Sequence, residues 1–321
     1  MPEPRYVALA SLVQLAILLL IPLELVLARR GLVRAEYELR DTLANVGVSI
    51  GSIFFWGTLS WILLGAVTYA YGHRLFNVPF TAASFALAFV LEDCRYYWWH
   101  RVSHRSRWFW ASHVVHHSSQ HFNLSTNLRQ SWTSQFSGLI LLSVPLAWLG
   151  FNPALVGLAF SLNLIYQFWI HTEMVDRMPR WFEWLLNTPS HHRVHHASNP
   201  RYLDANYAGV FMIWDRMFGT FVPEQTDEPP HYGLVKNLGT FNPIRIALAE
   251  YFAIGHDVLR RDLRFWHRLA YFFGPPGWSH DGSRGTTAQL RAREAERRRS
   301  GGQSVSGVQP RTADSLALTV G

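Results

Sequence analysis

The stretch WWHRVSHRSRWFWASHVVHH, residues 98–117, follows a long apolar run and carries five histidines. Residues at positions i, i+3 and i+4 share one face of a helix, so these histidines form two edges rich in imidazole. A second stretch, SHHRVHH at residues 190–196, repeats the spacing. The three groups are His100 with His104; His113 with His116 and His117; and His192 with His195 and His196.

These groups have the spacing of metal ligands. A neutral imidazole binds iron, zinc or copper, and crowding eight of them is costly unless a metal offsets their repulsion. Eight or nine imidazoles are too many for one ion, so the sequence predicts two ions with four or five ligands each. His171, in QFWIHTE, would be the ninth ligand, and His191 and His121 are weaker candidates.

Three carboxylates are candidates to hold the ligands from outside. Asp93 is seven residues before His100 and shares its helical face, so we expect it to accept an imidazole N–H. Asp204 and Asp215 are weaker candidates for the same role. Isolated histidines are interpreted as interfacial or hydrogen-bonded residues, namely His73, His231, His256, His267 and His280.

The composition indicates a membrane protein. Of 321 residues, 49% are hydrophobic and only 16% are charged, against about 25% charged in soluble domains. Cys94 is the single cysteine, which excludes an intrachain disulfide and a cysteine-based zinc finger. The net charge of +7 comes with arginines that flank apolar runs. This pattern favours membrane orientation over nucleic-acid binding, so no nucleic-acid partner is expected.

Apolar runs predict the topology. The expected spans are 6–28, 46–71 and 78–99, followed by a hairpin over 136–149 and 153–170. Glu24 lies near the end of the first span, where it can reach the interface. The arginines between residues 29 and 40 place the first loop in the cytoplasm. The sequence therefore predicts an all-α, polytopic integral membrane protein with a cytoplasmic, histidine-rich helical cap.

The expected domain organisation is simple. Residues 1–280 form one membrane-embedded domain, whose histidine-rich core covers about residues 92–221. Residues 281–321 turn to Arg, Gly, Ser and Thr, which predicts a disordered basic tail. Within that tail, residues 291–299 are either helical or simply solvated.

The histidine motifs resemble those of the fatty acid hydroxylase and sterol desaturase superfamily of membrane non-heme di-iron oxidases. The signature of that superfamily, His-x-x-x-His followed by two His-x-x-His-His motifs, matches the three groups above. The segments WASHVVHHSSQHFNLSTNLRQS, LIYQFWIHTE, NTPSHHRVHH and NYAGVFMIWDRMFGTF are most similar to one branch. That branch holds bacterial C-5 sterol desaturase-like and alkylglycerol monooxygenase-like members.

The resemblance implies an O2-dependent oxidoreductase with two iron ions per chain that desaturates or hydroxylates a membrane lipid. One alternative is ether-lipid cleavage of the alkylglycerol monooxygenase type. Arg105 stands where the ether-cleaving members are expected to have an acidic residue, which favours a sterol-like or other membrane lipid. A non-enzymatic alternative is a membrane protein that binds metal or transfers electrons.

Electrons must come from outside the chain, because the sequence has no Gly-x-Gly-x-x-Gly fingerprint and no recognisable heme domain. The resemblance implies a reductase, ferredoxin or cytochrome system, or tetrahydrobiopterin, as the donor. The implied location is a bacterial inner membrane, with the active site facing the cytoplasm.

Overall fold

The computed structural model describes residues 12–13, 15–134 and 136–300. Within these ranges the chain is helical, and its only β-type pairings are isolated bridges such as Leu186 with Phe211. The predicted all-α class is therefore confirmed.

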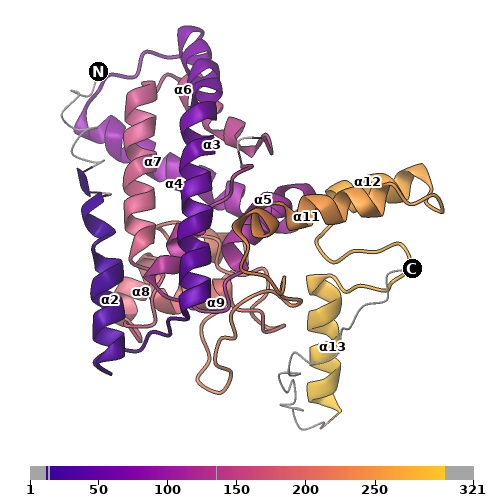
Figure 1. Cartoon of the computed structure of the whole chain (residues 1–321). Helices are drawn as coiled ribbons and strands as arrows, with labels where there is room; N and C mark the ends of the chain where they lie inside the picture. Colours follow the sequence, from indigo (N-terminus) through magenta and orange to yellow (C-terminus); the bar gives the residue numbers. More distant parts are fainter. Residues whose placement is uncertain (1–11, 14, 135, 301–321) are drawn as a thin grey trace.

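Four helices form a bundle. In Figure 1, α2 (Leu20–Arg29), α3 (Leu39–Gly72) and α7 (Pro153–Phe168) stand upright, and α4 (Ala82–Arg105) runs obliquely behind α7 and α3. The shorter helices α6 (Val144–Leu149) and η2 (Leu139–Ser143) pack on α3 and α4. The predicted hairpin turns at Gly150, whose φ of 117° suits glycine, and Pro153 opens α7 at a favourable position.

Caps and close contacts fix the bundle. The Thr81 side chain accepts from the Ser84 backbone N–H, and the Ser84 hydroxyl accepts from the Thr81 backbone N–H. These two hydrogen bonds form a capping box at the start of α4. Gly51 allows the Trp132 ring to lie against α3, because a Cβ there would be 2.1 Å from a ring carbon. The Trp132 indole N–H then donates to the Val48 carbonyl at 2.7 Å.

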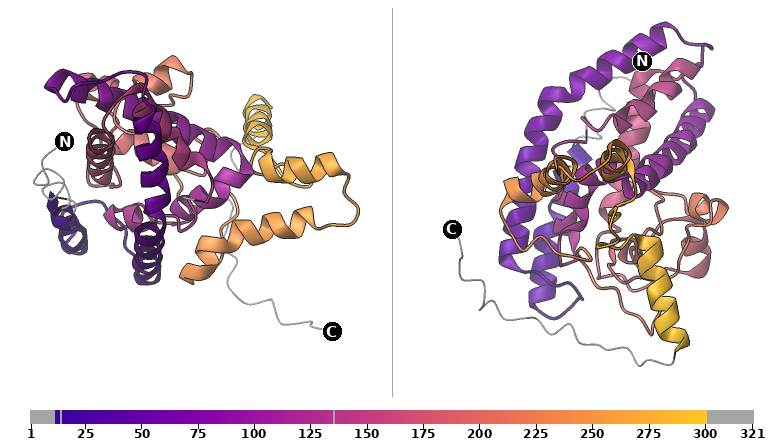
Figure 2. Two further views of the ribbon diagram at one scale, coloured as in Figure 1. Left: turned by 90° about the horizontal axis from the view of Figure 1, so that it is seen from above. Right: turned by 90° about the vertical axis from the view of Figure 1, so that its right-hand side faces the viewer.

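A second set of helices extends sideways as an arm (Figure 2). It contains α5 (Arg107–His117), α11 (Pro243–Val258) and α12 (Phe265–Phe273). The buried Arg107 guanidinium joins α5 to α11 through ion pairs with Glu250 at 2.6 Å and Asp257 at 2.7 Å. Short elements complete the chain: η1 (Leu124–Leu128), α8 (Arg180–Leu185), α9 (Pro189–His196), α10 (Ile213–Met217) and α13 (Thr287–Arg299).

The predicted tail is partly ordered. Thr286 caps α13 in a capping box with Gln289, and Arg298 pairs with Glu228 at 2.7 Å. The expectation of disorder from residue 281 is therefore wrong for residues 287–299, where the helical alternative holds. Residues 301–321 lie outside the described part of the chain.

The helices give only weak support for membrane spans. Among the described residues, no single helix is both long and apolar enough to cross a bilayer. The two parts of α3, Leu39–Gly57 and Ser60–Gly72, meet that criterion together and are bent by 42°. The predicted span 78–99 falls mostly in α4, which also carries charged residues, and the predicted span 6–28 lies partly outside the described residues.

Candidate metal centre

The nine histidines predicted as ligands come together in two groups. The five-histidine group contains His100, His104, His113, His117 and His195. The four-histidine group contains His116, His171, His192 and His196. Within each group the ligand atoms all lie within 4.8 Å of one another, and no side chain is more than 9% exposed.

Helix geometry divides neighbouring histidines between the groups. On α5, His113 and His117 are four residues apart and share a face, whereas His116 points about 100° away from His117. On α9 the same rule places His195 in one group and His196 in the other. The His117 and His196 rings stack with their centres 4.4 Å apart, so the two groups are in contact.

The Nε2 atoms face one another at short distances. In the five-histidine group the Nε2–Nε2 distances are 2.9 Å for His100–His113, 3.2 Å for His113–His117 and 3.1 Å for His117–His195. In the four-histidine group they are 3.1 Å for His116–His171, 2.9 Å for His171–His192 and 3.2 Å for His192–His196. Nitrogens bound at about 2.0–2.1 Å to one ion, at angles of about 90–110°, are about 2.9–3.4 Å apart. Both groups therefore fit a metal ion.

Backbone carbonyls anchor the opposite side of several rings. The Nδ1 atom of His100 lies 2.9 Å from the Tyr207 carbonyl, and that of His195 lies 2.9 Å from the Ala205 carbonyl. His171 Nδ1 lies 2.8 Å from the Gln167 carbonyl. A carbonyl only accepts, so Nδ1 carries the hydrogen and Nε2 keeps its lone pair for a metal.

Burial favours the neutral form of most of these imidazoles. It lowers the pKa of His171 to about 4. Burial first, and then repulsion from neighbouring imidazoles, lowers the pKa of most other members well below the usual value of 6.5. Neutral rings are the form that binds metal, so the site is prepared for cations at neutral pH.

The carbonyls that anchor the five-histidine group belong to residues 204–211, here called the anchor loop. Asp204 and Asn206 adopt left-handed backbone conformations, with φ of 56° and 55°. Such values are unusual outside glycine and indicate a backbone conformation that the surrounding contacts must stabilise. The Asn206 side chain ties the loop to the backbone of His191 and Val222.

Two buried carboxylates hold the anchor loop in place. Asp215 accepts from the backbone N–H groups of Tyr207 and Ala208, both at 2.8 Å. Asp93 accepts from the backbone N–H groups of Val210 and Phe211 at 2.8 and 2.9 Å. Gly209 permits this approach, because a Cβ there would be 2.9 Å from an Asp93 oxygen.

These contacts correct the expected roles of the carboxylates. Asp93 and Asp215 hold backbone N–H groups rather than an imidazole, so they act on the ligands through the loop. Asp204 is the carboxylate beside an imidazole, with its Oδ1 atom 3.5 Å from His104 Nδ1. The spacing of Asp93 and His100 along one helix suggested a direct contact between them. Instead, the anchor loop lies against Asp93 and donates its backbone N–H groups to the carboxylate.

The weaker histidine candidates lie outside both groups. His121 Nδ1 lies 3.6 Å from a Glu36 carboxylate oxygen. His191 contacts the Thr188 hydroxyl at 3.3 Å and lines a separate pocket. Burial lowers the pKa of His191 to about 4.

Sequence reasoning missed Glu24 as a structural support of the site. Its carboxylate is fully buried, not interfacial as expected. It accepts from the Tyr37 hydroxyl at 2.5 Å, from the Leu124 backbone N–H at 2.7 Å and from the Thr172 hydroxyl. Thr172 directly follows His171, so Glu24 ties α2 to the segment of that ligand candidate. The sequence signal for this role was that Glu24 is the single acidic residue in an apolar run.

Comparison with known proteins gives matches over the histidine-rich part of the chain. Residues 85–220 match the family model for fatty acid hydroxylase, and this range contains all nine histidines. The predicted resemblance to this family is confirmed. No solved structure matches the chain significantly.

Several curated proteins are similar over the same region. Alkylglycerol monooxygenase from Danio rerio is 46% identical over 199 residues, which cover 60% of this chain and 42% of the relative. The Homo sapiens alkylglycerol monooxygenase is 42% identical over 207 residues, 64% of this chain and 45% of the relative. Ornithine lipid hydroxylase OlsE from Rhizobium tropici is 28% identical over 146 residues, 42% of this chain and 40% of the relative. The chain thus spans less than half the length of these relatives, whose names describe oxidoreductases.

Proposed function

We propose that this chain, with its fatty acid hydroxylase signature at residues 85–220, is a membrane-bound di-iron monooxygenase that cleaves ether lipids. The observation that carries the proposal is the pair of buried histidine groups, whose Nε2 atoms converge while Nδ1 atoms are held by carbonyls. The reaction class is supported by the similarity to alkylglycerol monooxygenases.

The donor set suits two transition-metal ions. Nine imidazoles and no thiolate fit iron, zinc or copper, and the family resemblance favours iron. Bound iron would supply the activation of dioxygen that an unreactive C–H bond requires. The chain's own residues orient the imidazoles, hold the Nδ1 hydrogens and exclude water from the centre.

The proposed reaction balances as a monooxygenation. The ether R–CH2–O–R′ takes up O2, two electrons and two protons and gives R–CH(OH)–O–R′ and water. The C–H bond at the ether carbon is replaced by C–OH, and the second oxygen atom leaves as water. The resulting hemiacetal breaks its C–O bond to give an aldehyde and the alcohol HO–R′. A separate redox protein or a reduced pterin would supply the two electrons.

The position of Arg105 removes the argument for a sterol-like lipid. Its side chain is exposed at the end of α4, whereas His104, its neighbour, is buried in the five-histidine group. Arg105 belongs to neither histidine group, so its identity alone gives no reason to exclude an ether lipid. The ether-lipid alternative is therefore preferred over desaturation or hydroxylation of a sterol-like lipid.

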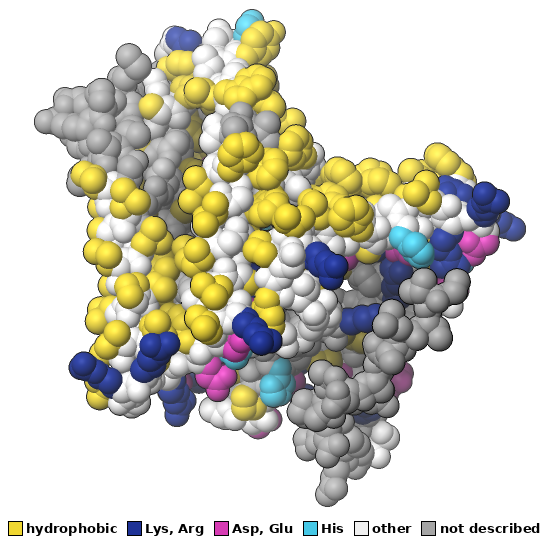
Figure 3. Space-filling model, viewed as in Figure 1, with side chains coloured by type: hydrophobic (Ala, Val, Ile, Leu, Met, Phe, Trp, Pro, Cys, Tyr) yellow, Lys and Arg dark blue, Asp and Glu magenta, His cyan; other side chains and the backbone are white. Residues whose placement is uncertain are grey.

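Exposed apolar side chains support a membrane location. Hydrophobic residues cover the outer face of α2 and α3 and the upper side of the arm, while arginines gather at the lower end of the bundle (Figure 3). On the arm, Phe252, Phe265 and Trp266 are 63–73% exposed. Such a surface is costly in water and suits an integral membrane protein. The arginine distribution favours a cytoplasmic position for the histidines.

The direct test uses the iron-loaded protein in lipid nanodiscs with a 1-O-alkylglycerol, O2 and either a reductase system or tetrahydrobiopterin. The expected products are a long-chain aldehyde and glycerol. His195→Ala should form no aldehyde, whereas His256→Ala should match the unmodified protein, because His256 is 83% exposed. Aldehyde formation without O2, or equal activity of His195→Ala, would contradict the proposal. Cholesterol and a fatty acyl glycerol, tested in parallel, would reveal the alternative hydroxylation.

A further inference from the structure

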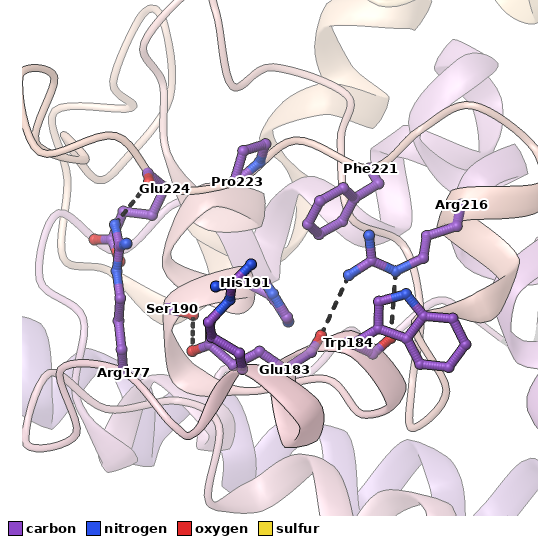
Figure 4. A pocket seen from close by; sticks show the side chains of 10 residues that line it. Arg177, Glu183, Trp184, Ser190, His191, Arg216, Phe221, Pro223 and Glu224 are labelled. Carbon is purple, nitrogen blue, oxygen red and sulfur yellow. Dashed lines mark hydrogen bonds between the residues drawn. The ribbon is translucent and has the colours of Figure 1, made fainter.

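A pocket next to the four-histidine group carries three arginines. It has a volume of about 350 Å³ and lies between α8, the start of α9 and the loop after α10. Arg177 and Arg216 enter from opposite sides, and His191 lies between them (Figure 4). His191 directly precedes His192 in the chain, so the pocket and the metal centre share α9.

The pocket has an unbalanced positive charge. Its lining includes Arg177, Arg180 and Arg216 against Glu183 and Glu224. The Glu224 carboxylate is already paired with Arg193, which donates to it at 2.7 and 3.0 Å from outside the lining. Three guanidinium groups therefore face one remaining carboxylate.

Glu183 is also occupied, and the arginines keep donors available. Its Oε1 atom accepts from the Ser190 hydroxyl at 2.7 Å and from the Met178 backbone N–H at 3.0 Å. Arg177 and Arg216 donate to backbone carbonyls. Within the described part of the chain, neither they nor Arg180 forms an ion pair with a carboxylate. Planar guanidinium groups at a concave site match the oxygens of a phosphate.

The surroundings of the pocket suit a lipid. Arg216 stacks on Phe221 with its guanidinium carbon 4.0 Å from the ring centre. On α8, next to the pocket, Trp181 and Trp184 are 69% and 60% exposed. Tryptophan beside arginine is typical of the headgroup level of a membrane. The volume exceeds what a phosphate ion alone needs and leaves room for a glycerol unit.

We propose that this pocket binds the phosphate ester of a lipid headgroup. Arg177, Arg180 and Arg216 contact the phosphate oxygens, while the chains of the lipid pass over the apolar side chains of α8. The inference goes beyond the proposed reaction and does not depend on it, because binding is measurable without turnover.

The test measures binding by calorimetry on the purified full chain in dodecyl maltoside, with dihexanoyl phosphatidic acid as the probe. Arg177→Gln/Arg180→Gln should weaken binding about tenfold or more, as expected for the loss of charge-assisted hydrogen bonds. The matched control is Arg297→Gln/Arg299→Gln on α13, which removes the same charge from exposed positions outside the pocket. This control should bind as the unmodified protein does.

Parallel measurements identify the ligand and exclude unfolding. Dihexanoylglycerol, which lacks the phosphate, should not bind, and inorganic phosphate should bind much more weakly than the lipid. Equal affinity for inorganic phosphate would overturn the assignment to a lipid, and equal weakening in the control variant would overturn the site. If the double variant unfolds, Arg180→Gln alone must show weaker binding. Metal content should be the same in all variants, so failure here is distinguishable from failure of the metal centre.

Discussion

Replacement of Asp215 by Asn should selectively weaken metal binding by the five-histidine group. Asp215 holds the backbone N–H groups of Tyr207 and Ala208, and the Tyr207 carbonyl in turn anchors His100. An asparagine has one oxygen, so its NH2 group would face a backbone donor. The anchor loop would then shift, and with it the carbonyls that orient His100 and His195.

The magnitude follows from the hydrogen bonds that the substitution removes. One or two hydrogen bonds to a buried carboxylate disappear, at about 1.5–3 kcal/mol each. The stability of the protein should therefore fall by about 1.5–6 kcal/mol. Loss of such an outer support lowers metal affinity by about 10–100-fold. The four-histidine group should keep its affinity, because its anchors are the carbonyls of Gln167 and Arg129.

The assay is equilibrium dialysis against buffered metal, followed by elemental analysis. Burial raises the pKa of Asp215 to about 6, so the measurement is made at pH 8, where its carboxylate is ionised. At limiting metal, Asp215→Asn should fall from about two ions per chain to about one. Added His104→Ala, which affects the same group, should change little further, whereas added His171→Ala should remove the second ion. The control is Asp262→Asn, an exposed residue in the connection between α11 and α12.

Equal loss of both ions in a folded Asp215→Asn protein would refute this reasoning. So would unchanged metal content at every free metal concentration. A melting measurement on the same samples separates loss of metal from loss of fold.

Three further predictions concern the site. His113→Ala and His196→Ala should abolish turnover, whereas His280→Ala should be nearly neutral; equal losses would show that the groups are not the metal centre. The metal-free protein should lose stability as the pH falls from about 6.5 to 4, because the unfolded chain protonates His171 near 6.5 and the folded chain only near 4. This difference is worth about 3 kcal/mol for His171 alone, and urea titrations at several pH values would detect it; a flat profile would contradict it. Glu24→Gln should lower stability by about 1–3 kcal/mol and reduce metal occupancy of the four-histidine group first, as measured by melting and elemental analysis; unchanged values would show that the buried contacts of Glu24 carry little energy.

The sequence predicted which histidines lie together. Histidines at i, i+3 and i+4 on one helix are related by fixed geometry, so the groups on α5 and α9 were recognisable from spacing alone. The ninth histidine, His171, was found because it ends an apolar run. The helical class followed from the long apolar runs in the same way.

Long-range supports were beyond sequence reasoning. Asp93 and Val210 are 117 residues apart, and no periodicity indicates that a carboxylate on α4 holds backbone N–H groups of the anchor loop. The loop itself has left-handed residues at Asp204 and Asn206 rather than glycine, which removes the usual sequence signal for such a turn. The interruptions of the predicted spans were hidden from the sequence for a related reason. Apolar composition indicates how favourably a segment transfers into lipid, but it does not show where a helix is interrupted, as at η2 or at the bend in α3.

The division of the candidate ligands between the helices determines which variants can separate the two proposed ions. Helices α5 and α9 each contribute histidines to both groups, so a change in the orientation of either helix moves candidate ligands of both proposed ions together. In contrast, α4 contributes His100 and His104 only to the five-histidine group, and His171 belongs only to the four-histidine group. Substitutions at His104 and His171 therefore act on one ion each, which is why they serve as partners for Asp215→Asn. Substitution at His117 or His196, whose rings stack on each other, should lower the affinity for both ions.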